Sequence, residues 1–485
     1  MEQMEKPVPE MVKKLILFAC LFGAMETATA LTLKQAVQHA LRTNPEILAQ
    51  RSEYLARQQE LEQARAGYLP SVDVTAGIGF ERSDNNATRL LGYDNRDLTR
   101  KEAGIGLNQM LFDGFAVKSE VERQQARIDS QRYALGGTAE NTGLDAVNAY
   151  LRVLREQDLV KLSEQNLKVH DRIFDQIQLR IQAGVGKRSD LEQIRGRRAS
   201  AASNLLADQA NLQDAESSFL SVVGDLPRDL EAAEPVADGL PTSLRQAIEL
   251  AVGNHPTLLS AKADVEAAKA QDRAARHGFY PKFNLEVGGT WNDDIDGITG
   301  RNDDLTAMVR MRYNLYAGGR DQARTRQTTE LINQARDIRD RTHRQVVESM
   351  RLAWAAYEVT RDQAAYQLQH IAASEKTRDA YVKQFTLGQR TLLDVLNMEN
   401  ELYQARRDYA STRYDHILAQ YRILVAMGGL ERYFSVDPIT AVAERGEAAE
   451  AFEDVATGSA VGDRIMPLRE QLNRQAPASG GGTGN

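Results

Sequence analysis

Cysteine, aromatic residues and long apolar runs are all scarce in this chain of 485 residues. Cys20 is the single cysteine, and aromatic residues make up 6% of the sequence. After the N-terminal region, no segment has the roughly eighteen consecutive apolar residues that a transmembrane helix needs. Lys and Arg total 60 against 68 Asp and Glu, a net charge of -8, which is unlike a nucleic-acid-binding protein.

Motifs for chemistry are missing as well. The histidines form no H-E-x-x-H pattern, which argues against a metal hydrolase. The segment from Gly184 to Ser189 superficially resembles a phosphate loop, but Arg188 stands where that loop needs Ser or Thr, and no strand precedes it. We therefore expect no enzyme activity, no cofactor and no metal.

One relaxed calcium-loop pattern is present. Asn292, Asp294, Asp296 and Gly297 are followed by Asp303 at the last position of the pattern. The segment lies between expected strands rather than between helices, begins with Asn and ends with Asp. These departures favour a solvated acidic loop over a calcium site.

The first residues have the layout of a secretory signal peptide, expected to span 1–30. Lys13 precedes the apolar run 15–22, and small residues up to Ala30 suit a cleavage site. Translation from Met11 and lipidation at Cys20 remain alternatives. Cleavage after Ala30 would remove the only cysteine, so the mature chain is expected to form no disulfide.

The chain is an internal duplication. Leu33–Pro45 returns as Leu244–Pro256, and Gly67–Pro70 returns as Gly278–Pro281, each 211 positions later. Beyond one loop the spacing settles at 204 and relates five pairs: Leu111 with Leu315, Gly114 with Gly318, Gly184 with Gly388, Asp190 with Asp394, and Gly224 with Gly428. So long a period excludes a solenoid. We expect two large repeats, 31–230 and 244–434, joined by a linker at 231–243.

Each repeat is expected to contain two strands, at 71–82 and 102–112 and again at 282–291 and 305–316. Apolar and polar residues alternate in these segments, and their length suits tilted strands that cross an outer membrane. Aromatic residues near the strand ends suit a membrane-interface belt: Tyr68, Phe112, Phe279, Tyr280 and Tyr316. A soluble sheet with one wet face is the alternative. Four strands cannot close a membrane cylinder, so several chains are expected to share one.

The rest of each repeat is expected to be helical, at 33–68, 116–182 and 189–223 and at 244–279, 320–386 and 392–426. Apolar residues in the long tracts have coiled-coil seam spacing. Gly184, Gly186 and Gly388 are expected to form the turns where the long helices reverse. The tail 435–485 is expected to be flexible in the periplasm. The predicted fold is mainly α, with a long coiled-coil tunnel and a membrane β-barrel.

The duplicated motifs resemble the TolC family of outer-membrane channels. They are Asn44-Pro45 with His255-Pro256, the Leu-Phe-Asp-Gly segment ending at Gly114 with its counterpart ending at Gly319, and the segment Phe385–Leu396. The resemblance is nearest to the type I secretion branch, which exports large repeat-rich adhesins. It implies a homotrimer with a twelve-stranded barrel in outer-membrane lipid. The implied partners are a periplasmic adaptor docked on the glycine turns, an inner-membrane ABC transporter and an exported protein.

The resemblance also implies a lock at the tip of the tunnel. Arg390 and Asp394 match an Arg and an Asp of the family's second turn, while Ser189 and Asp190 occupy the Thr and Asp positions of the first. In a trimer, Asp394 and Asp190 would form acidic rings, and Arg390 could bridge to the neighbouring chain near Ser189. The alternative for each charged residue is a solvated helix end.

Two residues depart from the family's lock. Phe385 stands where the family's model member has Tyr, so it has no hydroxyl group for Asp190. Asn397 stands where that member has a second Asp. We therefore expect a weaker lock and a less negative ring.

Two alternative functions remain at this point. The first keeps the channel and exports drugs or metal ions instead of proteins. The second is a structural coiled-coil protein of the periplasm or cell surface.

Overall fold

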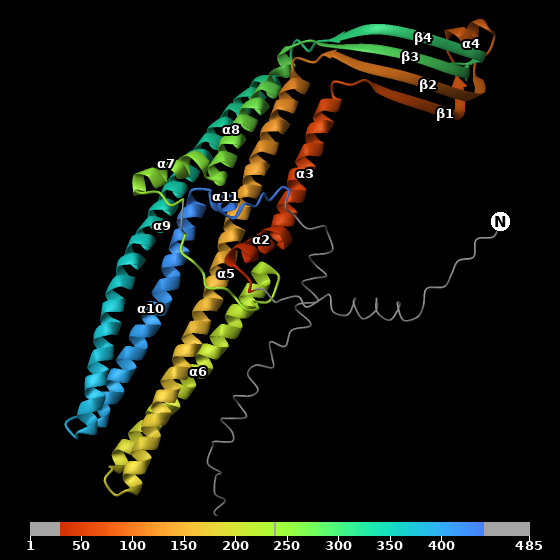
Figure 1. Cartoon of the computed structure of the whole chain (residues 1–485). Helices are drawn as coiled ribbons and strands as arrows, with labels where there is room; N and C mark the ends of the chain where they lie inside the picture. Colours follow the sequence, from red (N-terminus) through yellow and green to blue (C-terminus); the bar gives the residue numbers. More distant parts are fainter. Residues whose placement is uncertain (1–29, 237–238, 441–485) are drawn as a thin grey trace, which may run out of the picture.

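Two helices of 67 residues each, α5 (Ala116–Gln182) and α9 (Arg320–Thr386), run along the molecule (Figure 1). A rise of about 1.5 Å per residue makes each roughly 100 Å long. The computed structural model describes residues 30–236 and 239–440. Shorter helices pack along the long ones: α3 (Pro45–Ala66), α6 (Arg188–Val223), α8 (Pro256–Ala275) and α10 (Leu392–Ala426).

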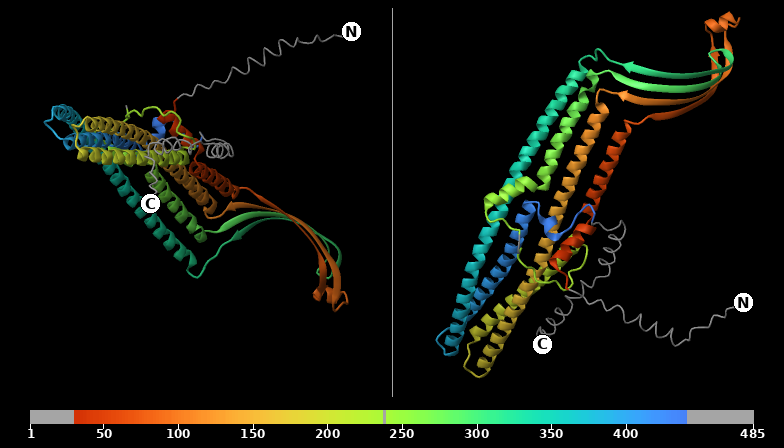
Figure 2. Two further views of the ribbon diagram at one scale, coloured as in Figure 1. Left: turned by 90° about the horizontal axis from the view of Figure 1, so that it is seen from below. Right: turned by 45° about the horizontal axis from the view of Figure 1, so that its top comes forward.

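A four-stranded sheet lies at one end of this rod. Its strands are β1 (Ser71–Ser83), β2 (Arg96–Phe112), β3 (Lys282–Ile295) and β4 (Ile298–Arg312). They pair antiparallel in chain order, so β2 and β3 join the two repeats, with Gly106 opposite Gly288. A short helix, α4 (Asn86–Leu90), lies in the β1–β2 connection. Figure 2 shows that the sheet is curved.

The helices expected at 33–68 and 244–279 are each divided, which corrects that expectation. The first becomes α2 (Leu33–Thr43) and α3, because Pro45 lacks an N–H and disfavours helical geometry at Asn44. The Asn44 side chain then accepts the Glu46 N–H at 2.9 Å and starts α3. In the second repeat Pro256 separates α7 (Leu244–Asn254) from α8, and a 3₁₀ turn (Arg276–Phe279) follows.

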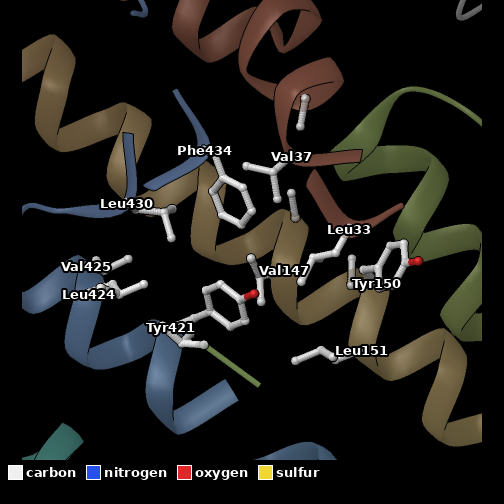
Figure 3. Packing of buried hydrophobic residues seen from close by; sticks show 14 of the residues in the cluster. Leu33, Val37, Val147, Tyr150, Leu151, Tyr421, Leu424, Val425, Leu430 and Phe434 are labelled. Carbon is white, nitrogen blue, oxygen red and sulfur yellow. The ribbon is translucent and has the colours of Figure 1, made fainter. Parts of the chain in front are cut away.

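The main hydrophobic core lies near the middle of the rod, where α2, α5, α10 and α11 (Leu430–Phe434) meet (Figure 3). The rings of Tyr421 and Phe434 stack with their centroids 5.8 Å apart. The hydroxyl oxygen of Tyr150 lies 2.7 Å from the carbonyl oxygens of both Leu31 and Glu231. The core therefore holds the segments before α2 and after α6 against the long helix.

The expected fold class is confirmed, since the chain is mostly helical, has four antiparallel strands and repeats its architecture. The expected signal peptide lies outside the described residues up to position 29. The expected tail is described only as far as Thr440, and Val436 within it is buried in the core. Among the helices of the described ranges, none combines the length and apolar character needed to cross a membrane.

Candidate functional site at the tips of the helical hairpins

The two long helices reverse at the end of the rod farthest from the sheet (Figure 1). Residues 183–187 connect α5 to α6, and residues 387–391 connect α9 to α10. Gly184 and Gly388 have φ of +77° and +76°, the left-handed region that glycine adopts without strain. A Cβ at Gly186 would lie 2.8 Å from the Ile181 backbone nitrogen, so this tight turn needs glycine too.

An apolar cluster joins the two hairpins just above these turns. Its buried members come from α5, α6 and α10: Ile177, Ile194, Leu392 and Leu396. Phe385 of α9 packs against the cluster, and the Arg180 guanidinium carbon lies 4.8 Å from its ring centroid. The tip of one chain is therefore a four-helix contact with an apolar centre.

Arg390 and Asp394 bond within their own hairpin. The Nε of Arg390 donates to Gln384 Oε1 at 3.1 Å, and its guanidinium carbon lies 4.3 Å from the Tyr381 ring centroid. Asp394 accepts the Thr391 hydroxyl at 2.8 Å and the Thr391 N–H at 3.1 Å, a capping box at the start of α10. These hydrogen bonds, the hydroxyl first, lower the pKa of Asp394, so the carboxylate is ionised at neutral pH.

The remaining predicted residues are divided between the two hairpins. Ser189 and Asp190 lie in the first turn of α6, and the Ser189 hydroxyl is 3.5 Å from Asp190 Oδ1. Asn397 of α10 accepts a hydrogen bond from Arg197 of α6 at 3.1 Å. Within the described part of the chain, no hydrogen bond or ion pair connects Arg390 with Ser189 or Asp190. One chain therefore brings Asn397 and Phe385 into contact with the other hairpin, and it leaves Arg390 and Asp394 apart from Ser189 and Asp190.

A buried polar cluster higher in the hairpins was not predicted from the sequence. Arg407 of α10 donates to Asp208 of α6 at 3.0 Å and to the Tyr403 hydroxyl at 3.0 Å. Ser163 of α5 also bonds to Asp208, and its hydroxyl lies 2.8 Å from that of Tyr403. The sequence does contain a signal for this cluster. Buried positions recur every seven residues along α5 and along α6, and Ser163 and Asp208 are polar residues at two of these positions.

A second unpredicted feature is a pair of buried carboxyl groups where α11 packs on α5. Glu140 of α5 accepts the N–H groups of Leu430 and Glu431 at 3.0 and 3.3 Å. Burial raises the pKa of Glu140 to about 7 although these two donors oppose the shift. Burial, and then the nearby charge of Glu140, raises the pKa of Glu431 to about 8. Both groups therefore exchange protons near neutral pH.

We expect this pair to make the protein less stable as pH rises from about 5.5 to about 8.5. Both carboxyl groups have an ordinary pKa of 4.5, so across this window the folded state binds more protons than the unfolded state. The thermal unfolding midpoint in detergent is expected to fall by several degrees. Glu140→Gln removes one titrating group and its repulsion on Glu431. The thermal unfolding midpoint of this variant is therefore expected to change less with pH than that of the wild type. Asp175→Asn, at an exposed position of α5, is the control; equal pH slopes in all three proteins would contradict the assignment.

The acidic segment with the calcium-loop pattern forms the end of the β3–β4 hairpin. Asn292 pairs with Asn302, and Asp303 pairs with Trp291 across the two strands. Asp294 accepts the Gly300 N–H at 2.9 Å, and Asp303 is bonded to Arg301 at 2.7 Å. No group of three or more potential metal ligands occurs in the described ranges.

Comparison with known proteins shows the family. A family model described as outer membrane efflux protein matches residues 36–225 and 247–429, one segment in each repeat. The chain belongs to this family of TolC-like outer-membrane channels, as the sequence resemblance predicted. It is an outer-membrane protein, with its helical part in the periplasm.

Several curated relatives match over most of their length. The outer membrane efflux protein BepC of Brucella suis is 31% identical over 87% of this chain and 91% of BepC. The outer membrane protein TolC of Escherichia coli is 23% identical over 84% of this chain and 85% of TolC. The alkaline protease secretion protein AprF of Pseudomonas aeruginosa is 24% identical over 86% of this chain and 89% of AprF.

A solved structure supports the fold. The outer membrane protein VceC of Vibrio cholerae superposes with a TM-score of 0.71 at 17% identity, covering 82% of this chain and 96% of VceC. At this identity the likeness concerns the fold alone.

Proposed function

We propose that this protein is a passive conduit that carries exported molecules from the periplasm through the outer membrane as a homotrimer. The observation that carries the proposal is a sheet of four strands joined to a rod of roughly 100 Å. About eight strands are the minimum for a closed membrane barrel, so one chain is too small. Three copies would supply twelve strands, and their helices would enclose a tunnel. The chain acts as a channel and carries no catalytic site in this proposal.

The energy for export would come from partners. An inner-membrane ABC transporter would supply it, and a periplasmic adaptor would dock on the turns at Gly184, Gly186 and Gly388. Apolar side chains beside these turns support a docking surface, because Val185 is 78% and Leu387 72% exposed. Exposed apolar groups at such a position favour contact with a second protein.

The tip residues would form the gate in the trimer. Arg390 would bridge to Ser189 and Asp190 of the partner subunit, and Asp394 and Asp190 would form acidic rings. Arg390 is exposed, and among the described residues its contacts are with Gln384 and Tyr381 of its own hairpin, so its side chain can reach a neighbouring subunit. Phe385 and Asn397 would hold the two hairpins of one chain together. Opening would require both kinds of contact to loosen.

Arg390→Ala is expected to increase the conductance of the resting channel severalfold in planar bilayers. Removing the guanidinium leaves Asp190 of the partner subunit without its bridging cation, so the closed tip loses contacts between subunits. Arg245→Ala is a matched control, because Arg245 is 90% exposed and lies in α7, away from the tip. An Arg390→Ala channel that conducts like the wild type would remove Arg390 from the gate.

Two classes of cargo are supported by different relatives. A secreted protein is the first candidate, and the likeness to AprF supports it. The segment Phe385–Leu396 near the tips, which resembles the family's motif, also favours this candidate. Small molecules are the second candidate, which the likeness to BepC supports. Deletion of the gene separates them: loss of a large protein from the culture medium identifies secretion, and increased sensitivity to toxic compounds identifies efflux.

A further inference from the structure

The first part of the linker, residues 231–236, is attached to both hairpins on its way from α6 to α7 (Figure 1). At its start, the Tyr150 hydroxyl of α5 donates to the Glu231 carbonyl at 2.7 Å. At its other end, the Val236 N–H donates to Gln420 Oε1 of α10 at 2.7 Å. Val236 is 8% and Gln420 5% exposed, so the second attachment is buried. This linker segment therefore connects α5 of one hairpin to α10 of the other.

The Val236 N–H determines how the Gln420 amide is oriented. A backbone N–H can only donate, so the amide oxygen of Gln420 faces Val236 and the amide nitrogen faces away from it. That nitrogen lies 3.1 Å from Nε2 of His416, one turn earlier on α10. Because the NH2 group of an amide is also only a donor, Nε2 of His416 accepts and carries no proton.

The other ring nitrogen of His416 requires the same tautomer. Its Nδ1 lies 3.1 Å from the Thr360 hydroxyl oxygen of α9, and that hydroxyl donates its only proton to the Ala356 carbonyl at 2.7 Å. The Thr360 oxygen therefore accepts, and Nδ1 of His416 carries the proton. The imidazole also stacks on the Tyr357 ring, with the centroids 5.2 Å apart. Two separate hydrogen bonds thus define a neutral imidazole with its proton on Nδ1.

We propose that protonation of His416 releases Val236 from Gln420, so that the linker segment is attached to α10 at neutral pH and detached in acid. A protonated imidazole has two donors and no acceptor, so its Nε2–H would meet the NH2 group of Gln420. If the amide turned its oxygen to the ring, its NH2 group would face the Val236 N–H instead. Either arrangement places two donors against each other at a buried site. All these groups belong to one chain, so the proposal does not depend on the conduit function.

The surroundings of His416 favour its neutral form in the attached state. Burial lowers the pKa of His416 below its ordinary value of 6.5, a hydrogen bond with the Tyr357 backbone opposes this shift, and the charge of Arg361 on α9 adds to it. After release the imidazole returns to its ordinary pKa. Below about pH 6.5 the released state therefore binds more protons than the attached state, and release becomes more favourable as pH falls.

Carboxylates near His416 are engaged elsewhere or exposed. Asp415, the preceding residue of α10, lies 3.7 Å from Arg155 of α5. Glu234 of the linker segment is exposed. Arg361 of α9 carries the same charge as a protonated imidazole. Among the described residues, no carboxylate forms an ion pair with His416, so a protonated ring would lack an anionic partner there.

The duplication shows that packing alone does not require this histidine. The spacing of 204 relates the turns on both sides of α6 and α10, so the equivalents of His416 and Gln420 are Leu212 and Glu216 of α6. Leu212 is a partly buried residue that packs against the main core. An apolar side chain therefore fills this position in the first repeat, and the second repeat places there a group that can be protonated.

Amide hydrogen exchange of the full-length oligomer in detergent, at about pH 7.5 and about pH 5, tests the proposal. After correction for the intrinsic pH dependence of exchange, protection of the Val236 amide is expected to be about tenfold lower at the acid pH. The Glu231 amide, which donates to the Leu31 carbonyl at 3.1 Å, reports on the other end of the segment and is expected to keep its protection. Equal protection of Val236 at both pH values, or an equal loss at Glu231, would overturn the proposal.

Three variants identify the titrating group. His416→Gln is neutral at every pH, so its Val236 protection is expected to be the same under both conditions. Gln420→Glu offers one oxygen to the Val236 N–H and the other to the protonated ring, so protection is expected to persist in acid. His343→Gln, at an exposed position of α9, is the control and is expected to behave like the wild type.

Two outcomes with these variants would contradict the proposal. The first is a wild-type loss of Val236 protection in His416→Gln, which would mean that another group titrates. The second is the same loss in Gln420→Glu, which would mean that the amide does not transmit the change to the linker segment. The comparison of Val236 with Glu231 in the wild type decides the outcome even if a variant does not assemble.

Discussion

Asp208→Ala is expected to lower the free energy of unfolding by about 3–5 kcal/mol, the usual cost of leaving one charge of a buried pair without its partner. The Asp208 side chain is 4% exposed and accepts two hydrogen bonds from Arg407. The variant leaves the Arg407 guanidinium among Ser163 and Tyr403, which offer hydroxyl groups but no charge. Thermal and chemical unfolding in detergent measure the loss.

Two further variants test whether the loss of stability comes from an unpaired buried charge. The double variant Asp208→Leu with Arg407→Leu is expected to recover much of the stability, because apolar replacement of a whole buried pair is often neutral. Glu192→Ala, which breaks an exposed pair with Arg195 on the same helix, is expected to cost about 1 kcal/mol or less. If Asp208→Ala costs no more than Glu192→Ala, the polar cluster does not stabilise the contact between hairpins.

Phe219→Ala is expected to be the second severe change, with a loss of about 3–5 kcal/mol from a cavity in the core. Phe219 is 0% exposed, and its ring centroid lies 6.3 Å from that of Tyr150. The cavity would loosen Tyr150, whose hydroxyl holds the segments at Leu31 and Glu231. We expect amide hydrogen exchange to accelerate in those segments before it does at the tips.

Leu206→Ala provides the comparison on the same helix. Leu206 is 41% exposed, so its truncation leaves little cavity and is expected to cost about 1 kcal/mol or less. If Phe219→Ala and Leu206→Ala lower the free energy of unfolding equally, the middle of the rod is not the rigid part of the molecule.

These two sites have different roles in the molecule. Phe219 lies where α6 ends against the central core, and Asp208 lies between that core and the tips. The core is apolar and closely packed, so it resists movement. Below it, the hairpins are joined by the Asp208–Arg407 pair, the Asn397–Arg197 hydrogen bond and the packing of Phe385. Movement of the tips is therefore expected to begin below Asp208 and to leave the core unchanged.

Much of the fold could be predicted from local pattern and repetition. Strands and long helices follow from hydrophobic periodicity, and the turns at Gly184 and Gly388 follow from residues that permit a positive φ. The duplication also made the architecture repeat. Within the expected helices, the breaks at Pro45 and Pro256 and the 3₁₀ turn at Arg276–Phe279 were not predicted, although proline is itself a local signal.

The candidate site was less predictable, because it depends on which helices meet and in what rotation. The sequence by itself determined where the tips lie and which charged residues they carry. Only the tertiary structure decided that Asn397 contacts Arg197, that Arg390 bonds inside its own hairpin, and that Arg407 reaches Asp208. Such pairs are distant along the chain, and a rotation of one helix by a fraction of a turn would separate them. Periodicity specifies the buried face of a helix, but packing against the other helices decides which polar groups on that face become partners.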